Sequence, residues 1–152
     1  MYDILMEFIK WFSKPKEIQH IGFEDMKYAI KTNQIIINTL SVFEQDCLIY
    51  GTVAYDKEEQ LINNLIDNNS KECSIIIYGK HCTDDSLQKK YNQLTKYGFQ
   101  QVYMYIGGLF EWLLLQDIYS CQEFPTTSIC KDILKYRAPS ILQSYKVLRL
   151  TT

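Results

Sequence analysis

Three short runs of apolar, largely β-branched or aromatic residues constrain the fold of this chain more than any other feature. They cover residues 34–39, 74–78 and 101–105, and segments with the helical spacing of apolar residues lie between and after them. The runs are continuous rather than alternating, which is typical of strands buried on both faces. Strands that alternate with helices form parallel sheets. The sequence therefore predicts an α/β fold, with a central parallel sheet flanked by helices on both faces.

The chain has 152 residues, a length that suits one domain with short extensions. Residues 1–20 are predicted to be an N-terminal helical extension, with His20 in a linker. Residues 21–120 form the domain, and residues 121–152 form a C-terminal extension that packs on it. A last strand is predicted at 145–150.

Composition excludes several function classes. The net charge is only −2, which does not indicate a nucleic-acid or anionic-membrane surface. The longest apolar stretch, at 109–115, contains Glu111 and is too short to span a bilayer. We therefore expect no nucleic-acid and no membrane partner.

The five cysteines are odd in number, form no CxxC pair and follow no secretory signal, so reduced thiols in the cytoplasm are expected. Richness in Ile, Asn, Lys and Tyr is typical of AT-rich genomes, such as those of protists or large DNA viruses.

Residues 73–112 contain the best candidate for a site. A predicted strand at 74–78 leads into the polar loop 79–84, an amphipathic helix, Gly98, the strand 101–105 and then Gly107-Gly108 before another helix. Ligands of parallel α/β sheets bind outside the carboxyl ends of the strands. The loop after Tyr78 is therefore the predicted binding loop.

The order of these elements and several short motifs resemble the rhodanese-like domain family. The matching pieces, in chain order, are Ile21-Gly22-Phe23, Leu48 to Val53, Tyr97-Gly98-Phe99 and Gly107-Gly108-Leu109-Phe110-Glu111-Trp112. The resemblance implies a rhodanese-like fold in which the loop after the strand holds an anionic sulfur or phosphate group.

The chain departs from that family at the residues that carry its chemistry. Asn38, Leu40 and Leu48 stand where the family has Asp, Arg and His. The family's nucleophilic cysteine follows the strand directly, and this position is Gly79. The nearest thiol is that of Cys82, three residues further on.

Two interpretations of the loop remain open. In one, Cys82 is a displaced nucleophile that holds a persulfide, stabilised by loop amides, Lys80 and His81. In the other, Asp84 or Asp85 caps the following helix and Cys82 is an ordinary thiol. A carboxylate about 4 Å from a thiolate costs roughly 1 to 4 kcal/mol, which disfavours the nucleophile if the acidic pair faces inward. The predicted binding loop comprises Gly79, Lys80, His81, Cys82, Thr83, Asp84 and Asp85.

Two further chemistries fit the loop poorly. A phosphatase of this fold requires His-Cys, five residues and then Arg, but Gln88 occupies the Arg position and no Arg precedes Arg137. A metal site from His81, Cys82, Asp84 and Asp85 would need tetrahedral geometry within one short loop. We therefore expect no metal and no cofactor.

The sequence favours a rhodanese-like protein without standard sulfurtransferase activity that acts as a binding or regulatory module. The alternative is an active thiosulfate-type sulfurtransferase that uses Cys82. The expected partner is an unidentified protein or a small sulfur-containing anion, and the oligomeric state stays open. The apolar helix near the N-terminus either covers the sheet or docks on a partner.

Overall fold

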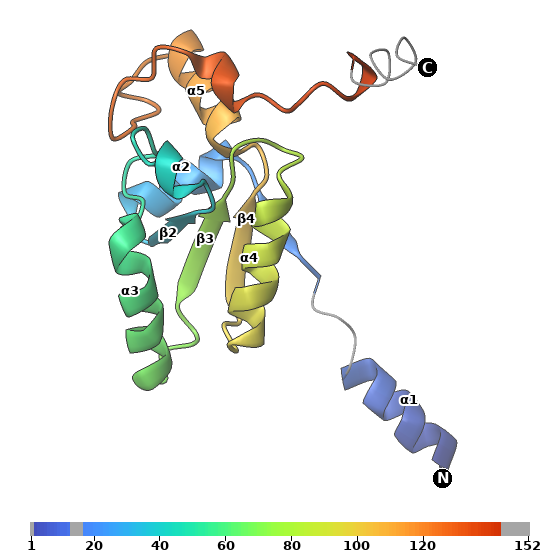
Figure 1. Ribbon diagram of the computed structural model, residues 1–152. Coiled ribbons are helices and arrows are strands. Elements are labelled where there is room, and N and C mark those ends of the chain that lie inside the picture. Colours follow the sequence, from blue (N-terminus) through green and yellow to red (C-terminus); the bar gives the residue numbers. More distant parts are fainter. Residues whose placement is uncertain (1, 13–16, 144–152) are drawn as a thin grey trace.

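The computed structural model describes residues 2–12 and 17–143. A parallel sheet of four strands forms the centre of the protein (Figure 1), with the strand order β1-β4-β3-β2. This confirms the predicted α/β fold with a central parallel sheet. The strands are β1 (Gln19–Ile21), β2 (Ile35–Asn38), β3 (Ser74–Tyr78) and β4 (Gln101–Tyr105).

The strand register brings the carboxyl ends of the strands to one edge. Asn38 at the end of β2 pairs with Tyr78 at the end of β3, and Tyr78 pairs with Tyr105 at the end of β4. Residues that directly follow these three positions therefore meet at the same edge of the sheet. Thr39, Gly79 and the Gly107-Gly108 turn come to this edge from different parts of the sequence.

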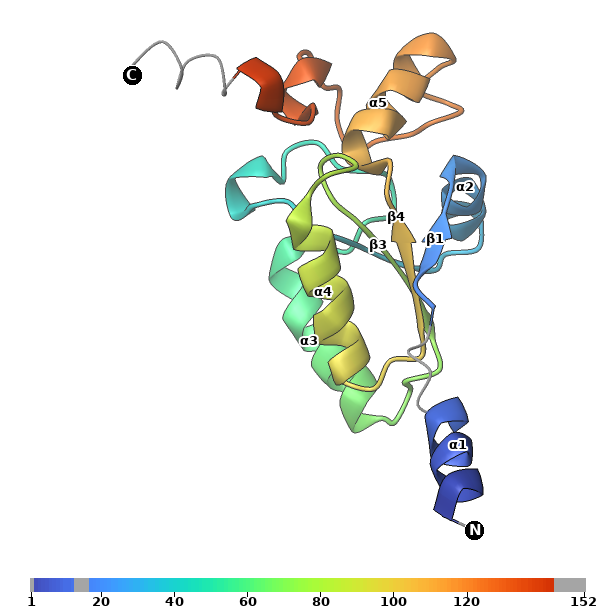
Figure 2. The same cartoon turned by 90° about the vertical axis from the view of Figure 1, so that its right-hand side faces the viewer.

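Helices cover both faces of the sheet, as Figure 2 shows. Successive strand residues point to opposite faces, so Ile75 and Ile77 lie in one apolar cluster and Ile76 and Tyr78 in the other. Helices α3 (Tyr55–Asp67) and α4 (Asp85–Lys96) cover the first face, and α2 (Phe23–Lys31) and α5 (Gly108–Ile118) contribute to the cluster on the second.

Helix α4 follows directly from its sequence. Leu87, Tyr91 and Leu94 recur at helical spacing and are all buried against the sheet. The helix begins after Asp84, whose side chain accepts a hydrogen bond from the Ser86 amide. It ends before Gly98, which has a φ of +96° and lets the chain turn into β4.

The segment after α5 packs on the domain. Phe124 and Tyr136 are buried in the same cluster as Trp112. The Thr127 amide donates to the Leu48 carbonyl over 2.8 Å, so residues 125–128 run alongside residues 47–50. Two 3₁₀ helices complete the described chain: η1 (Val42–Glu44) and η2 (Ile133–Tyr136).

Helix α1 (Tyr2–Phe12) lies apart from the sheet and its covering helices in both views (Figures 1 and 2). It has the position and length that the apolar spacing near the N-terminus predicts. Within the described residues, no helix is long and apolar enough to cross a membrane.

One strand differs from the prediction. The linker assigned to His20 is wrong, because His20 lies in β1, which pairs in parallel with β4 at the edge of the sheet. Three residues, Gln-His-Ile, carry neither a continuous apolar run nor an alternating pattern, so local sequence could not reveal the strand. The predicted strand at 145–150 lies outside the described residues.

Candidate functional site

The loop after β3 lies at the carboxyl edge of the sheet. Gly79 is buried, and the chain then passes over the edge to Asp84 before α4 begins. We call the space between Gly79, Thr39 and the side chain of Asp84 the loop interior. It is where the resemblance places a reactive group, because position 79 directly follows the strand.

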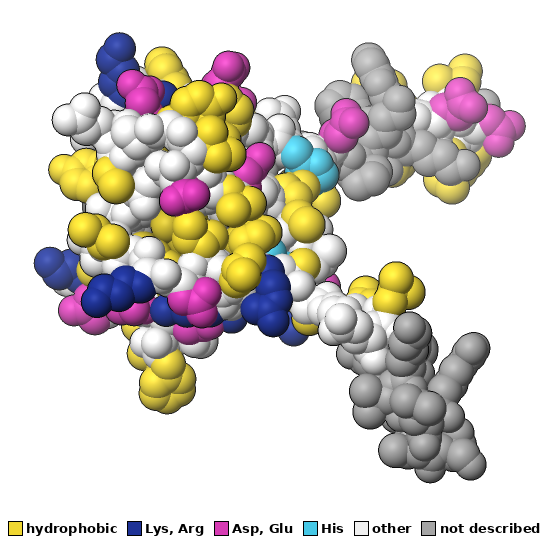
Figure 3. Space-filling view, turned by 90° about the horizontal axis from the view of Figure 1, so that it is seen from above, with side chains coloured by type: hydrophobic (Ala, Val, Ile, Leu, Met, Phe, Trp, Pro, Cys, Tyr) yellow, Lys and Arg dark blue, Asp and Glu magenta, His cyan; other side chains and the backbone are white. Residues whose placement is uncertain are grey.

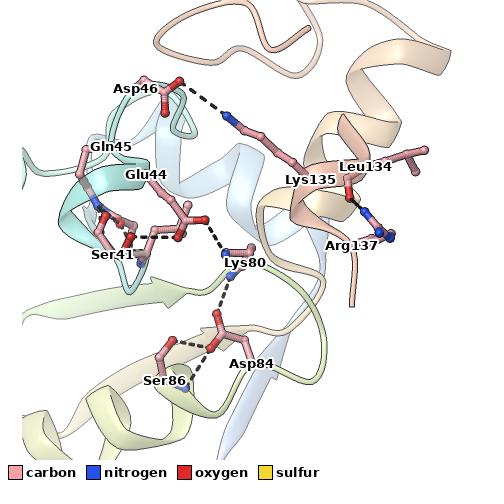
Figure 4. Close-up of polar contacts among 12 residues, drawn as sticks. Ser41, Glu44, Gln45, Asp46, Lys80, Asp84, Ser86, Leu134, Lys135 and Arg137 are labelled. Atoms are coloured by element: carbon pink, nitrogen blue, oxygen red, sulfur yellow. Dashed lines mark hydrogen bonds and ion pairs between the residues drawn. The ribbon is translucent and has the colours of Figure 1, made fainter. Parts of the chain in front are cut away.

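The Asp84 carboxylate points into the loop interior (Figure 4). Its Oδ2 atom accepts a hydrogen bond from the Lys80 amide over 2.9 Å. Its Oδ1 atom accepts from the Ser86 amide over 3.0 Å and from the Ser86 hydroxyl over 2.6 Å. The prediction that one member of the acidic pair caps α4 is confirmed for Asp84.

Gly79 leaves the room that this carboxylate fills. A Cβ atom at position 79 would lie 2.8 Å from Asp84 Oδ2 and 3.2 Å from Thr39 Oγ1. Separations below 3 Å between a carbon and an oxygen atom are repulsive, so any side chain at position 79 requires the carboxylate to move. Gly79 and the inward Asp84 are therefore structurally dependent on each other.

The loop stabilises Asp84 in its charged form. Partial burial raises the pKa of the Asp84 carboxyl. Hydrogen bonds from the Ser86 hydroxyl and from the Lys80 and Ser86 amides lower this pKa by more than burial raises it, so the net shift is a decrease. The loop interior therefore contains a fixed negative charge that already uses two backbone amides and one hydroxyl.

The backbone amides in the first turn of α5 also have hydrogen-bond partners. The Leu109 amide donates to the Gly79 carbonyl over 3.0 Å, and the Phe110 amide donates to the Lys80 carbonyl over 2.9 Å. Gly108 permits this approach, because its φ is +67° and a Cβ there would lie 2.7 Å from the Gly79 oxygen. These amides hold the loop in place and are not directed at a ligand.

Lys80 faces away from the loop interior. Its ammonium group forms an ion pair with Glu44 of η1 (Figure 4), and both side chains are about three-quarters buried. Burial raises the pKa of Glu44, but the bonds from Lys80 and from Ser41 outweigh this and lower it overall. The expected use of Lys80 to stabilise a thiolate on Cys82 finds no support in this arrangement.

The remaining predicted residues lie on the outside of the loop. Cys82, Thr83 and Asp85 are exposed, and Asp85 is the first residue of α4. His81 Nδ1 lies 3.1 Å from Thr83 Oγ1 and 3.3 Å from the Thr83 amide nitrogen, so the imidazole is engaged within the loop. No hydrogen bond of the described residues involves the Cys82 thiol.

Two contacts that hold the loop involve residues that the sequence did not indicate, Ser86 and Glu44. Thr39 Oγ1 lies 2.7 Å from Ser86 Oγ, which joins the end of β2 to the loop. The spacing Asp84-x-Ser86 is typical of a cap motif and could have indicated Ser86. The partnership of Glu44 with Lys80 has no such local signal, since 36 residues separate the two.

A shallow groove of about 490 Å³ opens beside the loop, between α3 and α4. Thr39 and Ser86 lie at one end of its lining, and Glu58, Lys89 and Lys90 contribute charges of both signs. An ion pair between Glu58 and Lys90 joins the two helices. Because Glu58 pairs with Lys90, Lys89 is the one charged side chain of this lining without a partner inside it. Among the described residues, no three His, Cys, Asp or Glu side chains gather in a way that could hold a metal ion.

Comparison with known proteins reveals similarity in structure but not in sequence. No family model matches the chain, and no curated protein matches it by sequence. The solution structure of a rhodanese-like domain from Anabaena sp. superposes with a TM-score of 0.54 and 23% identity, over 82% of this chain and 86% of that domain.

Two further structures show the same similarity. A Bacillus halodurans protein reaches a TM-score of 0.52 at 20% identity, over 76% of this chain and 82% of that one. A yeast protein tyrosine phosphatase of the rhodanese family superposes with a TM-score of 0.53 at 11% identity, over 82% of this chain and 100% of that chain. At these identities the likeness establishes the architecture. The chain has the rhodanese-like fold.

Proposed function

We propose that this protein is a rhodanese-like domain that has no standard sulfurtransferase activity and serves as a binding or regulatory module. The observation that carries the proposal is the position of the Asp84 carboxylate, 2.8 Å from where a Cβ at Gly79 would lie. A sulfurtransferase needs a thiolate that accepts sulfur and a set of donors that stabilises the resulting anion. Here position 79 has no thiol, and the Lys80 and Ser86 amides already donate to a carboxylate.

The binding surface that we propose lies next to the loop, on η1. The Lys80–Glu44 ion pair holds η1 against the loop, and the Gln45 amide group donates to Asn38 Oδ1 over 2.9 Å. Phe43, directly before these two anchoring residues, is 93% exposed. A large aromatic side chain held in water on a fixed turn is suited to anchor a protein partner.

The face of the molecule seen in Figure 3 also suits a protein partner. Viewed from above in Figure 3, hydrophobic side chains gather in the middle of the main body, with Lys, Arg, Asp and Glu along one side. An apolar area bordered by charges is typical of protein-interaction surfaces.

The catalytic half of the proposal is tested by the intact mass of the full chain after incubation with thiosulfate. We expect no added sulfur on the wild type or on Cys82→Ser. Gain of one sulfur atom that is lost in Cys82→Ser and removed by cyanide would overturn the proposal.

The binding half is tested with a matched pair of variants. Phe43→Ser removes the exposed aromatic beside the loop, and Tyr28→Ser removes one that is 61% exposed on α2. We expect proteins captured by the wild type to be lost with Phe43→Ser and kept with Tyr28→Ser. Equal capture by both variants would place the interaction elsewhere.

Sulfur transfer by Cys82 is the second candidate, because the thiol is exposed in the loop and accessible to thiosulfate. In that reaction the Cys82 thiolate attacks the outer sulfur, sulfite leaves with the bonding electron pair, and Cys82 keeps the transferred sulfur as a persulfide. Among the described residues no hydrogen bond reaches the Cys82 thiol, so in this arrangement the persulfide has no protein donor to stabilise it.

A further inference from the structure

Two cysteines that the loop chemistry does not use lie together on the second face of the sheet. Cys47 is 2% exposed and belongs to the apolar cluster of that face, and Cys130 is partly buried and packs against the same cluster. Cys73 packs in the cluster on the opposite face, and Cys82 and Cys121 are exposed. All five are free thiols. Cys47 and Cys130 are therefore the pair that the fold brings to one place.

The chain segments that carry these two cysteines run antiparallel to each other. The Thr127 amide donates to the Leu48 carbonyl over 2.8 Å, and the Leu48 amide donates to Thr127 Oγ1 over 3.0 Å. One residue further along each segment, the Cys47 thiol donates to the Ser128 carbonyl over 3.4 Å. Cys47 thus lies opposite Ser128, and Cys130 follows two residues later. Residues two apart in an extended segment point to the same side, which places both thiols on the core side.

The separation of the two residues is close to what a disulfide needs. Diagonal neighbours in an antiparallel pair have Cα atoms about 7 to 8 Å apart, and disulfides join Cα atoms up to about 6.8 Å apart. A movement of about 1 Å at Cys130 closes this gap. The backbone there is free to move, because Ile129 is exposed and no backbone hydrogen bond of the described residues involves residues 129–131.

The surroundings of the two thiols give them different roles. Burial raises the pKa of the Cys47 thiol, and the nearby Cys130 thiol adds to this increase. Cys130 lies nearer to solvent and to Lys135 of η2, which forms an ion pair of 3.7 Å with Asp46 (Figure 4). The pKa of Lys135 is raised, chiefly by Tyr136 and also by Asp46 and Cys130. A cation near a thiol favours the thiolate, so Cys130 is suited to react first with an oxidant.

We propose that Cys47 and Cys130 form a redox-sensitive pair that a hydroperoxide converts into a disulfide. The Cys130 thiolate attacks the outer peroxide oxygen, the O–O bond breaks, and the other oxygen leaves with the bonding electron pair and takes up a proton. This step leaves a sulfenic acid on Cys130. The Cys47 thiolate then attacks the Cys130 sulfur, the S–O bond breaks, and the oxygen leaves as water. The two thiols lose two electrons in total, and the hydroperoxide gains them.

The disulfide locks the segment after α5 to the segment between η1 and α3. In the reduced protein these segments are joined by hydrogen bonds, among them one from the Ser128 hydroxyl to the Asp46 carbonyl over 2.6 Å. Trp112 also donates to the Pro125 carbonyl over 3.1 Å, so the locked segment covers the core beside α5. The bond closes a loop of about 80 residues, which restricts the unfolded chain strongly. Oxidation therefore stabilises the fold and slows the opening of this segment.

The first test treats the full chain with hydrogen peroxide and maps its peptides without reduction. In the wild type we expect Cys47 linked to Cys130 within one chain. In Cys73→Ser/Cys82→Ser/Cys121→Ser, where only the pair remains, we expect a monomer whose intact mass falls by two hydrogen atoms and which has no thiol left to alkylate. Dithiothreitol should restore both thiols. The oxidised form should unfold at a higher urea concentration, and hydrogen exchange at the Thr127 amide should be slower than in the reduced form.

The matched control, Cys47→Ser/Cys82→Ser/Cys121→Ser, keeps two partly buried thiols, Cys73 and Cys130, on opposite faces of the sheet. Its oxidation should add oxygen to the monomer or join two chains, without an internal disulfide, and circular dichroism should show both triple variants folded. The proposal is overturned if the wild type gains oxygen without a Cys47–Cys130 link, or if the control forms an internal disulfide equally fast. Equal urea midpoints for the oxidised and reduced pair contradict the lock.

Discussion

The carboxylate of Asp84 and the missing side chain of Gly79 occupy one space: Asp84 Oδ2 lies 2.8 Å from where a Cβ at position 79 would be. The carboxylate also accepts a hydrogen bond from the Lys80 amide, which could otherwise donate to a bound anion. This protein thus holds a negative charge of its own where the fold could accommodate a reactive group.

The pairing predicts how a thiol at position 79 would behave. In Gly79→Cys, the new thiol lies against a carboxylate, whereas in Gly79→Cys/Asp84→Gly the charge is gone and the Lys80 amide is free. Removing a charge at about 4 Å is worth roughly 1 to 4 kcal/mol, so the thiol pKa should fall by about one to three units between single and double variant. The pH dependence of alkylation measures this difference.

Cys82→Ser in both backgrounds removes the other loop thiol from that measurement. Equal thiol pKa values in the two proteins would show that the Asp84 carboxylate does not act on position 79.

Loss of the Asp84 cap should destabilise the protein. Asp84→Ala removes the acceptor for two amides and a hydroxyl, and cap losses typically cost about 1 to 2 kcal/mol. The expected signal is a lower free energy of unfolding in urea near pH 7. Asp85→Ala, at the exposed first residue of α4, is the control and should cost less than about 1 kcal/mol.

The contribution of Asp84 should also depend on pH. Its pKa is lower in the folded protein than its ordinary value of 3.8, so the folded state binds its proton less tightly than the unfolded state does. The stabilisation is therefore complete above that value and is lost as the pH falls through the folded pKa. The difference between wild type and Asp84→Ala should shrink in acid. A constant difference down to the acid transition would contradict this role.

Gly108→Ala should be markedly destabilising. Its φ of +67° disfavours any side chain, and the new Cβ would meet the Gly79 oxygen at 2.7 Å. Strain of this kind costs about 1 to 3 kcal/mol. Gly22→Ala is the control, because no atom lies within 4 Å of its Cβ position; as Gly22 is the N-cap of α2, we expect a cost of less than about 1 kcal/mol.

The ion pair between Lys80 and Glu44 predicts that Lys80 has no effect on the Cys82 thiol. In Lys80→Gln, the alkylation rate of Cys82 across pH should equal that of the wild type, since the ammonium group is held on η1. A slower rate in Lys80→Gln would show that Lys80 turns towards Cys82 in solution and would favour sulfur transfer.

Much of the fold follows from local patterns. The Ile35–Ile37 and Ile75–Ile77 runs predict buried strands because β-branched residues without alternation suit two covered faces. The spacing of Leu87, Tyr91 and Leu94 predicts α4, and the acidic residues before it predict its cap.

Other features required tertiary contacts. β1 is a strand only because β4 offers it hydrogen bonds, since Gln19–Ile21 carries no periodic signal. The Lys80–Glu44 pair joins two elements that are distant in sequence.

The sequence by itself determined the parallel α/β architecture, the loop at the edge of the sheet and the absence of a thiol at position 79. Only the tertiary structure decided that Asp84 points inward, that Lys80 turns to Glu44 and that the α5 amides bond to loop carbonyls. The physical reason is that the direction of a loop side chain depends on the space and the donors that other segments supply. Thr39, Gly79 and Gly108 meet only after the strands align.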